Sequence, residues 1–303
     1  RPYAHQAPVG WWFPYFGRCL FGKTALGFRF FSAVFFVAGA ALLAAEVRRR
    51  AGNGPAATWI AILLVLPSTV VYAGMPGIES VSLFFGALFF GTWERWREQP
   101  TRRRAWTTAL VFLAGTQVAW SFYFLAPGVL LAEFLRPAPE RRLKPALLLF
   151  ALGFLGFALV VTHLLVGARS LEAVLGDVLD TAGTVVRGDM SRDRFFLGRE
   201  IRFFPAQWGF LLENVGPTLG PAMLAAAALV LGTRFGRRDA LTRAAVAFTA
   251  HGVLTVVVFQ GRSNTHGYYW FLMGPSAALW LVQATRLALF AVRARRRPLV
   301  LAG

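Results

Sequence analysis

Residues suited to chemistry fall in three stretches of this 303-residue chain, each beside a long apolar segment. His5 and Gln6 precede the first such segment, Glu79 opens another, and Arg262–Tyr269 precedes the last. A carboxylate can act as a general base on a hydroxyl group or hold a divalent cation. We expect these acid, imidazole and amide groups to meet on one face, with Glu79, His5 and His266 as the catalytic side chains. The expected substrate-binding side chains are Gln6, Arg199, Arg262, Asn264, Tyr268 and Tyr269.

Two of these assignments have simpler structural alternatives. Pro76 and Gly77 break the chain just before Glu79, and a lone carboxylate at a helix N-terminus commonly stabilises the helix dipole. Tyr268 and Tyr269 stand where aromatic side chains often anchor a helix at the membrane interface. Because these roles need no substrate, the site hypothesis depends on the three stretches lying together.

The segments that position these residues are apolar and long enough to form membrane helices. Hydrophobic residues make up 56% of the chain, and its ten Trp and 29 Phe suit lipid contact and interfacial belts. The single cysteine, Cys19, excludes an intrachain disulfide framework. The sequence therefore predicts an all-α, polytopic transmembrane helical bundle. The apolar blocks are Thr24–Ala45, Ala56–Ala73, Gly77–Trp93, Trp106–Ala119, Phe122–Leu135, Pro145–Gly167, Gly216–Gly232, Leu241–Phe259 and Tyr268–Val292.

Clusters of Lys and Arg occupy every second gap between these blocks. If each block crosses the membrane once, all the clusters fall on one side, which the positive-inside rule makes cytoplasmic. The expected location is the cell membrane, with the candidate site on the extracytoplasmic face. The formal net charge of +18 is then a topology signal, so nucleic acid binding is the weaker explanation. The clusters are Arg48–Arg50; Arg95, Arg97 and Arg102–Arg104; Arg136, Arg141, Arg142 and Lys144; Arg234, Arg237, Arg238 and Arg243; and Arg293 with Arg295–Arg297.

The segment Trp106–Leu135 is long enough for one helix, but basic clusters flank both of its ends. A single crossing would break the alternation downstream, so we expect a hairpin of two short spans that turns around Trp120–Pro127. Pro127 would disrupt the helical hydrogen bonds there. Each arm is shorter than about 20 residues, so a re-entrant pair buried among its neighbours is an alternative.

The stretch Ala168–Val215 separates the N-terminal blocks from the C-terminal ones. Its six Arg meet seven Asp and Glu, so it is nearly neutral within a strongly basic chain. Ser170–Thr184 carries apolar residues at helical spacing, which favours an amphipathic helix on the membrane surface. We expect a transmembrane core over 1–167, an extracytoplasmic interfacial segment over 168–215, and C-terminal transmembrane helices over 216–303. The interfacial segment either connects the helices or covers a substrate.

Short motifs, taken in order, resemble those of a known enzyme family. They are His5-Gln6-Ala7-Pro8, Leu20-Phe21-Gly22, Gly27-Phe28-Arg29-Phe30-Phe31-Ser32-Ala33, Leu66-Pro67 with Glu79, and more weakly His266-Gly267-Tyr268-Tyr269 and Gly274-Pro275. This order is similar to that of GT-C fold glycosyltransferases of the dolichyl-phosphate-mannose mannosyltransferase and aminoarabinose transferase-like family (glycosyltransferase family 39-like). The resemblance covers Ala4–Gly167 and extends to the remainder only through its layout.

The resemblance implies transfer of a sugar from a polyprenyl-phosphate-linked donor to a lipid or protein acceptor on the extracytoplasmic face. Arg262 or Arg199 would stabilise the departing phosphate electrostatically, with Glu79 in a supporting role. The family places an essential acid upstream of its His-Pro-Pro run, so we expect this chain to be N-terminally truncated. His5 is followed by Gln6 rather than Pro, which leaves its role open. A divalent cation also stays open as a cofactor.

A second hypothesis from another class is a membrane transporter or lipid flippase. That class is expected to hold charged residues at mid-bilayer depth and to show internal symmetry between its halves. The apolar blocks contain few ions, and no inverted repeat is apparent in the sequence. A third hypothesis, a non-catalytic assembly or scaffold subunit, is favoured if the complete gene product lacks the upstream acidic loop.

Overall fold

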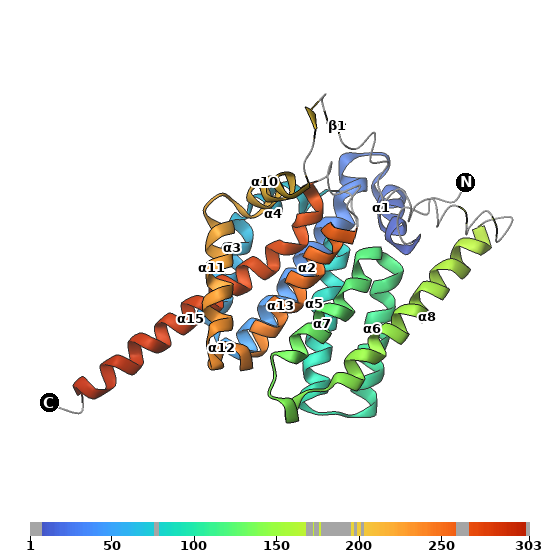
Figure 1. Cartoon of the computed structure of the whole chain (residues 1–303). Coiled ribbons are helices and arrows are strands. Elements are labelled where there is room, and N and C mark those ends of the chain that lie inside the picture. The colour runs from blue at the N-terminus through green and yellow to red at the C-terminus, as the bar shows by residue number, and fades with distance from the viewer. Residues whose placement is uncertain are drawn as a thin grey trace.

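The chain folds into a bundle of α-helices, and the computed structural model describes residues 8–75, 79–167, 172, 176, 195–196, 199–200, 203–258 and 267–300 (Figure 1). The all-α prediction is confirmed, because the sheet in this part of the chain is one antiparallel pair of two-residue strands, β1 (Phe195–Phe196) and β2 (Arg199–Glu200). The α-helices are α1 (Trp12–Phe21), α2 (Ala25–Ala51), α3 (Asn53–Val65), α4 (Pro67–Tyr72), α5 (Glu79–Glu98), α6 (Arg102–Val118), α7 (Leu125–Phe134), α8 (Leu143–Gly167), α10 (Phe203–Val215), α11 (Leu219–Gly232), α12 (Arg234–Arg238), α13 (Ala240–Val258) and α15 (Met273–Val300). The 3-10 helices are η1 (Pro8–Trp11), η2 (Trp120–Phe124), η3 (Ala138–Glu140) and η5 (Gly267–Leu272).

Four helices in the described part of the chain are long and apolar enough to cross a membrane. A fifth candidate is the pair α10 and α11, which are bent by 95° relative to each other. The surface of α8 is apolar, with Phe154 77% and Val166 87% exposed, as suits contact with lipid rather than water. The helices are therefore compatible with a membrane protein. The four spans are Ala25–Ala51, Leu143–Val166, Ala240–Val258 and Trp270–Val292.

The predicted block Ala56–Ala73 is two helices rather than one. Helix α3 ends at Val65, and Leu66 takes an extended conformation with φ −65° and ψ 132°. A residue that precedes proline is pushed out of the helical region, so Pro67 ends α3 and becomes the first residue of α4. The break therefore separates α3 from α4 at the extended Leu66.

The hairpin prediction for Trp106–Leu135 is confirmed, since α6 and α7 are separate helices joined by η2. The guanidinium of Arg104, at the start of α6, donates to the carbonyl of Arg95 in α5 at 2.8 Å. Arg136, just after α7, contacts Glu94 in the same turn of α5 at 3.4 Å, so both flanks lie at one end of the bundle. The predicted cause of the turn is wrong, because the helix breaks at the extended Ala119, whereas Pro127 lies in the first turn of α7. Proline is tolerated in the first turn because the backbone N–H groups there have no hydrogen-bond partner within the helix.

The C-terminal part of the predicted interfacial segment 168–215 belongs to the bundle. Gln207, Leu211, Asn214 and Val215 of α10 are buried, and Leu211 and Val215 join the main apolar core. This core includes residues of α2, α3, α5, α11, α13 and α15, so the helices before 168 and after 215 share one interior. The amphipathic helix predicted over Ser170–Thr184 lies outside the described residues, apart from positions 172 and 176.

A second apolar core lies between α5, α6, η2 and α7. Phe89, Phe112 and Phe122 form its centre, with ring centroids 5.5 to 6.4 Å apart. Helix α7 approaches α13 closely at Gly128, where an added Cβ would lie 2.6 Å from the carbonyl oxygen of Ala247. Only glycine allows the two backbones to come this close. The close contact packs the hairpin against α13 of the main core.

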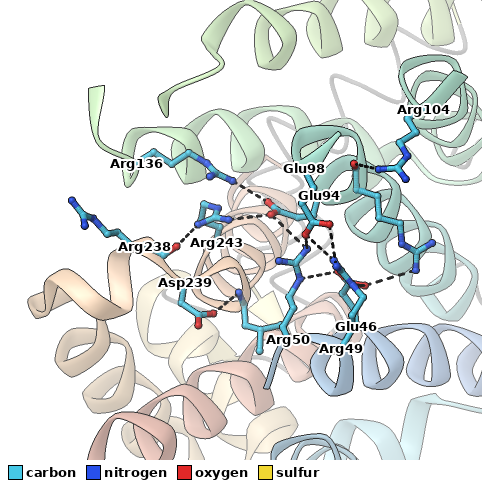
Figure 2. A network of polar contacts seen from close by, with 12 residues as sticks. Glu46, Arg49, Arg50, Glu94, Glu98, Arg104, Arg136, Arg238, Asp239 and Arg243 are labelled. Atoms are coloured by element: carbon cyan, nitrogen blue, oxygen red, sulfur yellow. Dashed lines mark hydrogen bonds and ion pairs between the residues drawn. The ribbon is translucent and has the colours of Figure 1, made fainter. Parts of the chain in front are cut away.

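Ion pairs join the helix ends at one end of the bundle, called here the arginine end: the C-terminal turns of α2, α5 and α7 and the N-terminus of α13 (Figure 2). Glu46 pairs with Arg49 and Arg50 in its own helix, and both arginines reach Glu98 of α5 at 3.0 and 2.9 Å. Hydrogen bonding from Arg49 lowers the pKa of Glu98. Four of the predicted basic clusters thus meet at this end, as the alternation predicts.

The fifth basic cluster lies farther along α15. Arg286 of α15 pairs with Asp239 at 3.0 Å, and the helix continues beyond Arg286 toward its C-terminus, away from the rest of the bundle (Figure 1). Asp239 also caps α13, because its side chain accepts a hydrogen bond from the N–H of Leu241 at 2.8 Å.

Candidate functional site

The site end is the end of the bundle opposite the arginine end, where α4 ends, α5 begins and η5 lies. The hydroxyl of Ser80 donates to the carbonyl of Ala73 at 3.1 Å, which fixes the start of α5 beside the last turn of α4. The ring of Tyr72 lies 6.5 Å from that of Phe271 in η5, at 77°. Glu79, the first residue of α5 and half-buried, therefore opens a helix whose start and η5 both border the C-terminus of α4.

Helix α10 covers the same end of the bundle beside α4 (Figure 1). The indole N–H of Trp270 in η5 donates to the side-chain oxygen of Gln207 at 2.9 Å, in a buried contact. Glu213, exposed on α10, lies close enough to Tyr72 for its charge to act on the phenol. A hydrogen-bonding amide and a second carboxylate thus lie at the site end, and neither was among the predicted site residues.

The structure describes the predicted site residues unequally. It places the Glu79 side chain, and it gives Tyr268 and Tyr269 in η5 and Arg199 in β2 as backbone only. The elements that carry Glu79 and the two tyrosines, α5 and η5, meet at the site end. The other predicted residues lie outside the described part of the chain; they are His5, Gln6, Arg262, Asn264 and His266.

A buried histidine inside a membrane-length helix was also not among the predicted site residues. His251 of α13 is 1% exposed, and its ring lies 6.5 Å from that of Phe122 in η2, at 76°. An ionisable residue within an apolar span is costly and usually faces the bundle interior. The signal was therefore present, since His251 interrupts the apolar block Leu241–Phe259.

Several side-chain hydroxyl groups are buried without a hydrogen-bond partner among the residues that the structure describes, and two of them are relevant to the site end. These two belong to Ser68 of α4 and Ser82 of α5. Gly274, at the start of α15, lies against Ser68, because an added Cβ would be 3.4 Å from its oxygen. A buried hydroxyl without a partner carries a desolvation cost, so these groups can take a further ligand or water.

The chemistry available at this end is that of a carboxylate at a helix start. Within the described ranges, no group of three or more His, Cys, Asp or Glu side chains could hold a metal ion. Glu79 can accept a proton from a hydroxyl without a metal. The same position also lets Glu79 stabilise the N-terminus of α5, so geometry alone permits both roles.

A comparison of the chain with known protein families and with curated proteins finds no match.

Proposed function

We propose that this protein is an integral membrane glycosyltransferase of the GT-C type. It transfers a sugar from a polyprenyl-phosphate-linked donor to a lipid or protein acceptor, on the extracytoplasmic face of the cell membrane. The observation that carries the proposal is the position of Glu79. This carboxylate begins α5 at the end of the bundle opposite the arginine end, beside the helix that contains Tyr268 and Tyr269.

The position suits the chemistry of a lipid-linked donor. The phosphate of such a donor lies at headgroup depth while its chain stays in hydrocarbon, so the reacting groups must lie at the helix ends. Basic residues favour the cytoplasmic side, which assigns the arginine end to the cytoplasm and Glu79 to the opposite boundary. The apolar flank of α8 is exposed along its length and offers a surface for the hydrocarbon chain.

The proposed reaction uses Glu79 as a proton acceptor. The acceptor hydroxyl gives its proton to the carboxylate as its oxygen forms a bond to the anomeric carbon. The bond between that carbon and the phosphate oxygen breaks, and polyprenyl phosphate leaves with the electron pair. Arg262 and Arg199 are the proposed phosphate ligands, because a guanidinium forms charge-assisted hydrogen bonds to phosphate oxygens.

Replacement of Glu79 by Gln tests this role, because it keeps the size of the side chain and removes its charge. The full-length protein and the variant are compared in sugar transfer from a polyprenyl-phosphate donor. We expect turnover to fall by about 10²-fold or more. The matched control is Glu140→Gln, the same change at an exposed position of the arginine end, which should leave turnover unchanged.

A structural role for Glu79 predicts a different result. Loss of a helix-capping charge costs about 1 kcal/mol of stability and leaves turnover nearly intact. Normal turnover by a Glu79→Gln protein with reduced thermal stability would contradict the proposed mechanism.

One observation favours the second candidate, a membrane transporter or lipid flippase. His251 is buried in the interior of the bundle within a membrane-length helix, and ionisable groups at such depth commonly mark transport pathways. The fate of the substrate in the wild-type protein and in a His251→Gln variant separates the candidates. The transferase proposal expects the lipid donor to be consumed by the wild-type protein, whereas the transporter hypothesis expects an intact substrate to cross the bilayer and the variant to lose that movement.

A further inference from the structure

The arginine end contains a buried group with more positive than negative charge. Arg97 pairs with Glu133 at 2.5 Å, Arg243 pairs with Glu94 at 3.0 Å, and Arg136 lies 3.4 Å from both acids. Two carboxylates thus face three guanidinium groups, and Glu94 also lies 3.8 Å from Arg50, which pairs with Glu46 and Glu98. Figure 2 shows Arg136 and Arg243 approaching Glu94 from two different elements. We name Arg97, Arg136 and Arg243 the arginine triad.

The triad has hydrogen-bond donors that its neighbours do not use. The Nε atoms of all three arginines are buried and make no hydrogen bond to a described residue. The Nε of Arg136 has only the ion-pair contact with Glu133, at 3.4 Å. The exposed fraction of the side chain is 6% for Arg97, 6% for Arg243 and 12% for Arg136. An uncompensated charge and unpaired donors are both unfavourable in a desolvated interior. A bound anion with several oxygens would remove both costs.

The three arginines also repel one another. Burial, followed by the charge of Arg243, lowers the pKa of Arg136 to about 10. Burial lowers the pKa of Arg97 as well; the charges of Glu133 and Glu94 oppose this shift, and those of Arg142 and Arg243 add to it. An anion placed among the triad would reverse this repulsion.

We propose that the arginine triad binds a phosphate group. Phosphate presents several oxygens to forked guanidinium donors, and basic pockets between membrane helices at headgroup depth commonly hold anionic lipid headgroups. The same chemistry fits free phosphate. An anion would reach the triad beside the loop after α7, because Arg136 is the most exposed member of the triad. Arg141 is exposed beside it, and its Nε donates to the carbonyl of Arg136 at 3.0 Å. The proposal does not depend on sugar transfer.

The test measures binding to the purified full-length protein in a neutral detergent. The probes are inorganic phosphate, dioctanoyl phosphatidic acid and, as a zwitterionic control, dioctanoyl phosphatidylcholine, and the readouts are calorimetric titration and the shift in thermal unfolding temperature. We expect phosphatidic acid to bind and to stabilise the protein, and phosphatidylcholine to do neither. If inorganic phosphate binds as tightly as phosphatidic acid, the site is assigned to free phosphate. If inorganic phosphate binds more weakly than phosphatidic acid, the site is assigned to a lipid headgroup. Both results support the proposal.

Two variants separate a site from general attraction between charges. Arg136→Gln removes one member of the triad, and Arg103→Gln removes the same charge from an exposed position of the arginine end. We expect the first to weaken phosphate binding by about tenfold or more and the second by less than about twofold. Arg136→Lys keeps the positive charge but lacks the forked donors of the guanidinium. It replaces Arg136→Gln in this test if the Gln variant does not fold. Equal losses in the triad and control variants, or no binding of either phosphate probe to the wild-type protein, would overturn the proposal.

Discussion

Replacement of Glu94 by Gln should strongly destabilise the arginine end. Glu94 is 3% exposed and lies 3.0 Å from Arg243, 3.4 Å from Arg136 and 3.8 Å from Arg50. The amide cannot balance these charges, so three guanidinium groups lose one shared partner. Removal of one partner from a buried ion pair costs about 3–5 kcal/mol. We expect a loss in this range for Glu94→Gln.

The assay is equilibrium unfolding of the purified protein in mixed micelles. Glu140→Gln, an exposed change at the same end, should shift the free energy of unfolding by less than about 0.5 kcal/mol. A double variant, Glu94→Gln with Arg243→Met, also removes one of the positive charges left without a partner, so it should be more stable than the Glu94→Gln single variant. The reasoning fails if Glu94→Gln resembles the Glu140 control, or if the second substitution lowers stability further.

Three other predictions follow from the fold. Gly128→Ala should cost about 1–3 kcal/mol in the same unfolding assay, because the new Cβ would contact the α13 backbone; a neutral effect would show that α7 and α13 can separate. Because the pKa of Glu98 is lowered from its ordinary value of 4.5, the stability that its charge provides is fully present above about pH 5 and is lost as the pH falls through the lowered pKa; the stability of Glu98→Gln should change less over that interval. Finally, Arg103→Cys and Arg238→Cys should be labelled from the same side of the membrane by an impermeant maleimide, once exposed Cys19 is replaced by Ser; labelling from opposite sides would contradict the topology.

Apolar composition was enough to predict most of the helices. The block Leu241–Phe259 corresponds to α13 (Ala240–Val258), because a long apolar run next to a capping aspartate allows few other structures. The predicted block Gly77–Trp93 ends five residues before the observed helix, because α5 continues to Glu98. Its last turn is charged and is stabilised by ion pairs with other helices, which hydrophobicity does not report.

Local rules that were available explain two of the differences. The residue before Pro67 is extended, so the break between α3 and α4 was predictable from the steric restriction on that residue. Helix α10 was overlooked in a charged stretch, although Gln207, Leu211, Asn214 and Val215 repeat at helical spacing and are buried.

The long-range contacts could not be read from the sequence. Glu94 and Arg243 are 149 positions apart, and nothing in the pattern of charges selects this pair from the many arginines at the helix ends. For the candidate site, Pro76 and Gly77 indicated that a helix begins at Glu79, as it does. The approach of Tyr72 to Phe271, which brings η5 to the same end, depends on tertiary packing.

The fate of the lipid-linked donor tests the central claim most directly. The full-length protein is reconstituted in vesicles with polyprenyl-phosphate sugars labelled in the sugar, together with a membrane extract that supplies acceptors. Our account predicts that the label moves to a lipid or protein acceptor while free polyprenyl phosphate accumulates in equal amount. Donor that remains intact, or that crosses the bilayer without cleavage, would contradict the glycosyltransferase assignment.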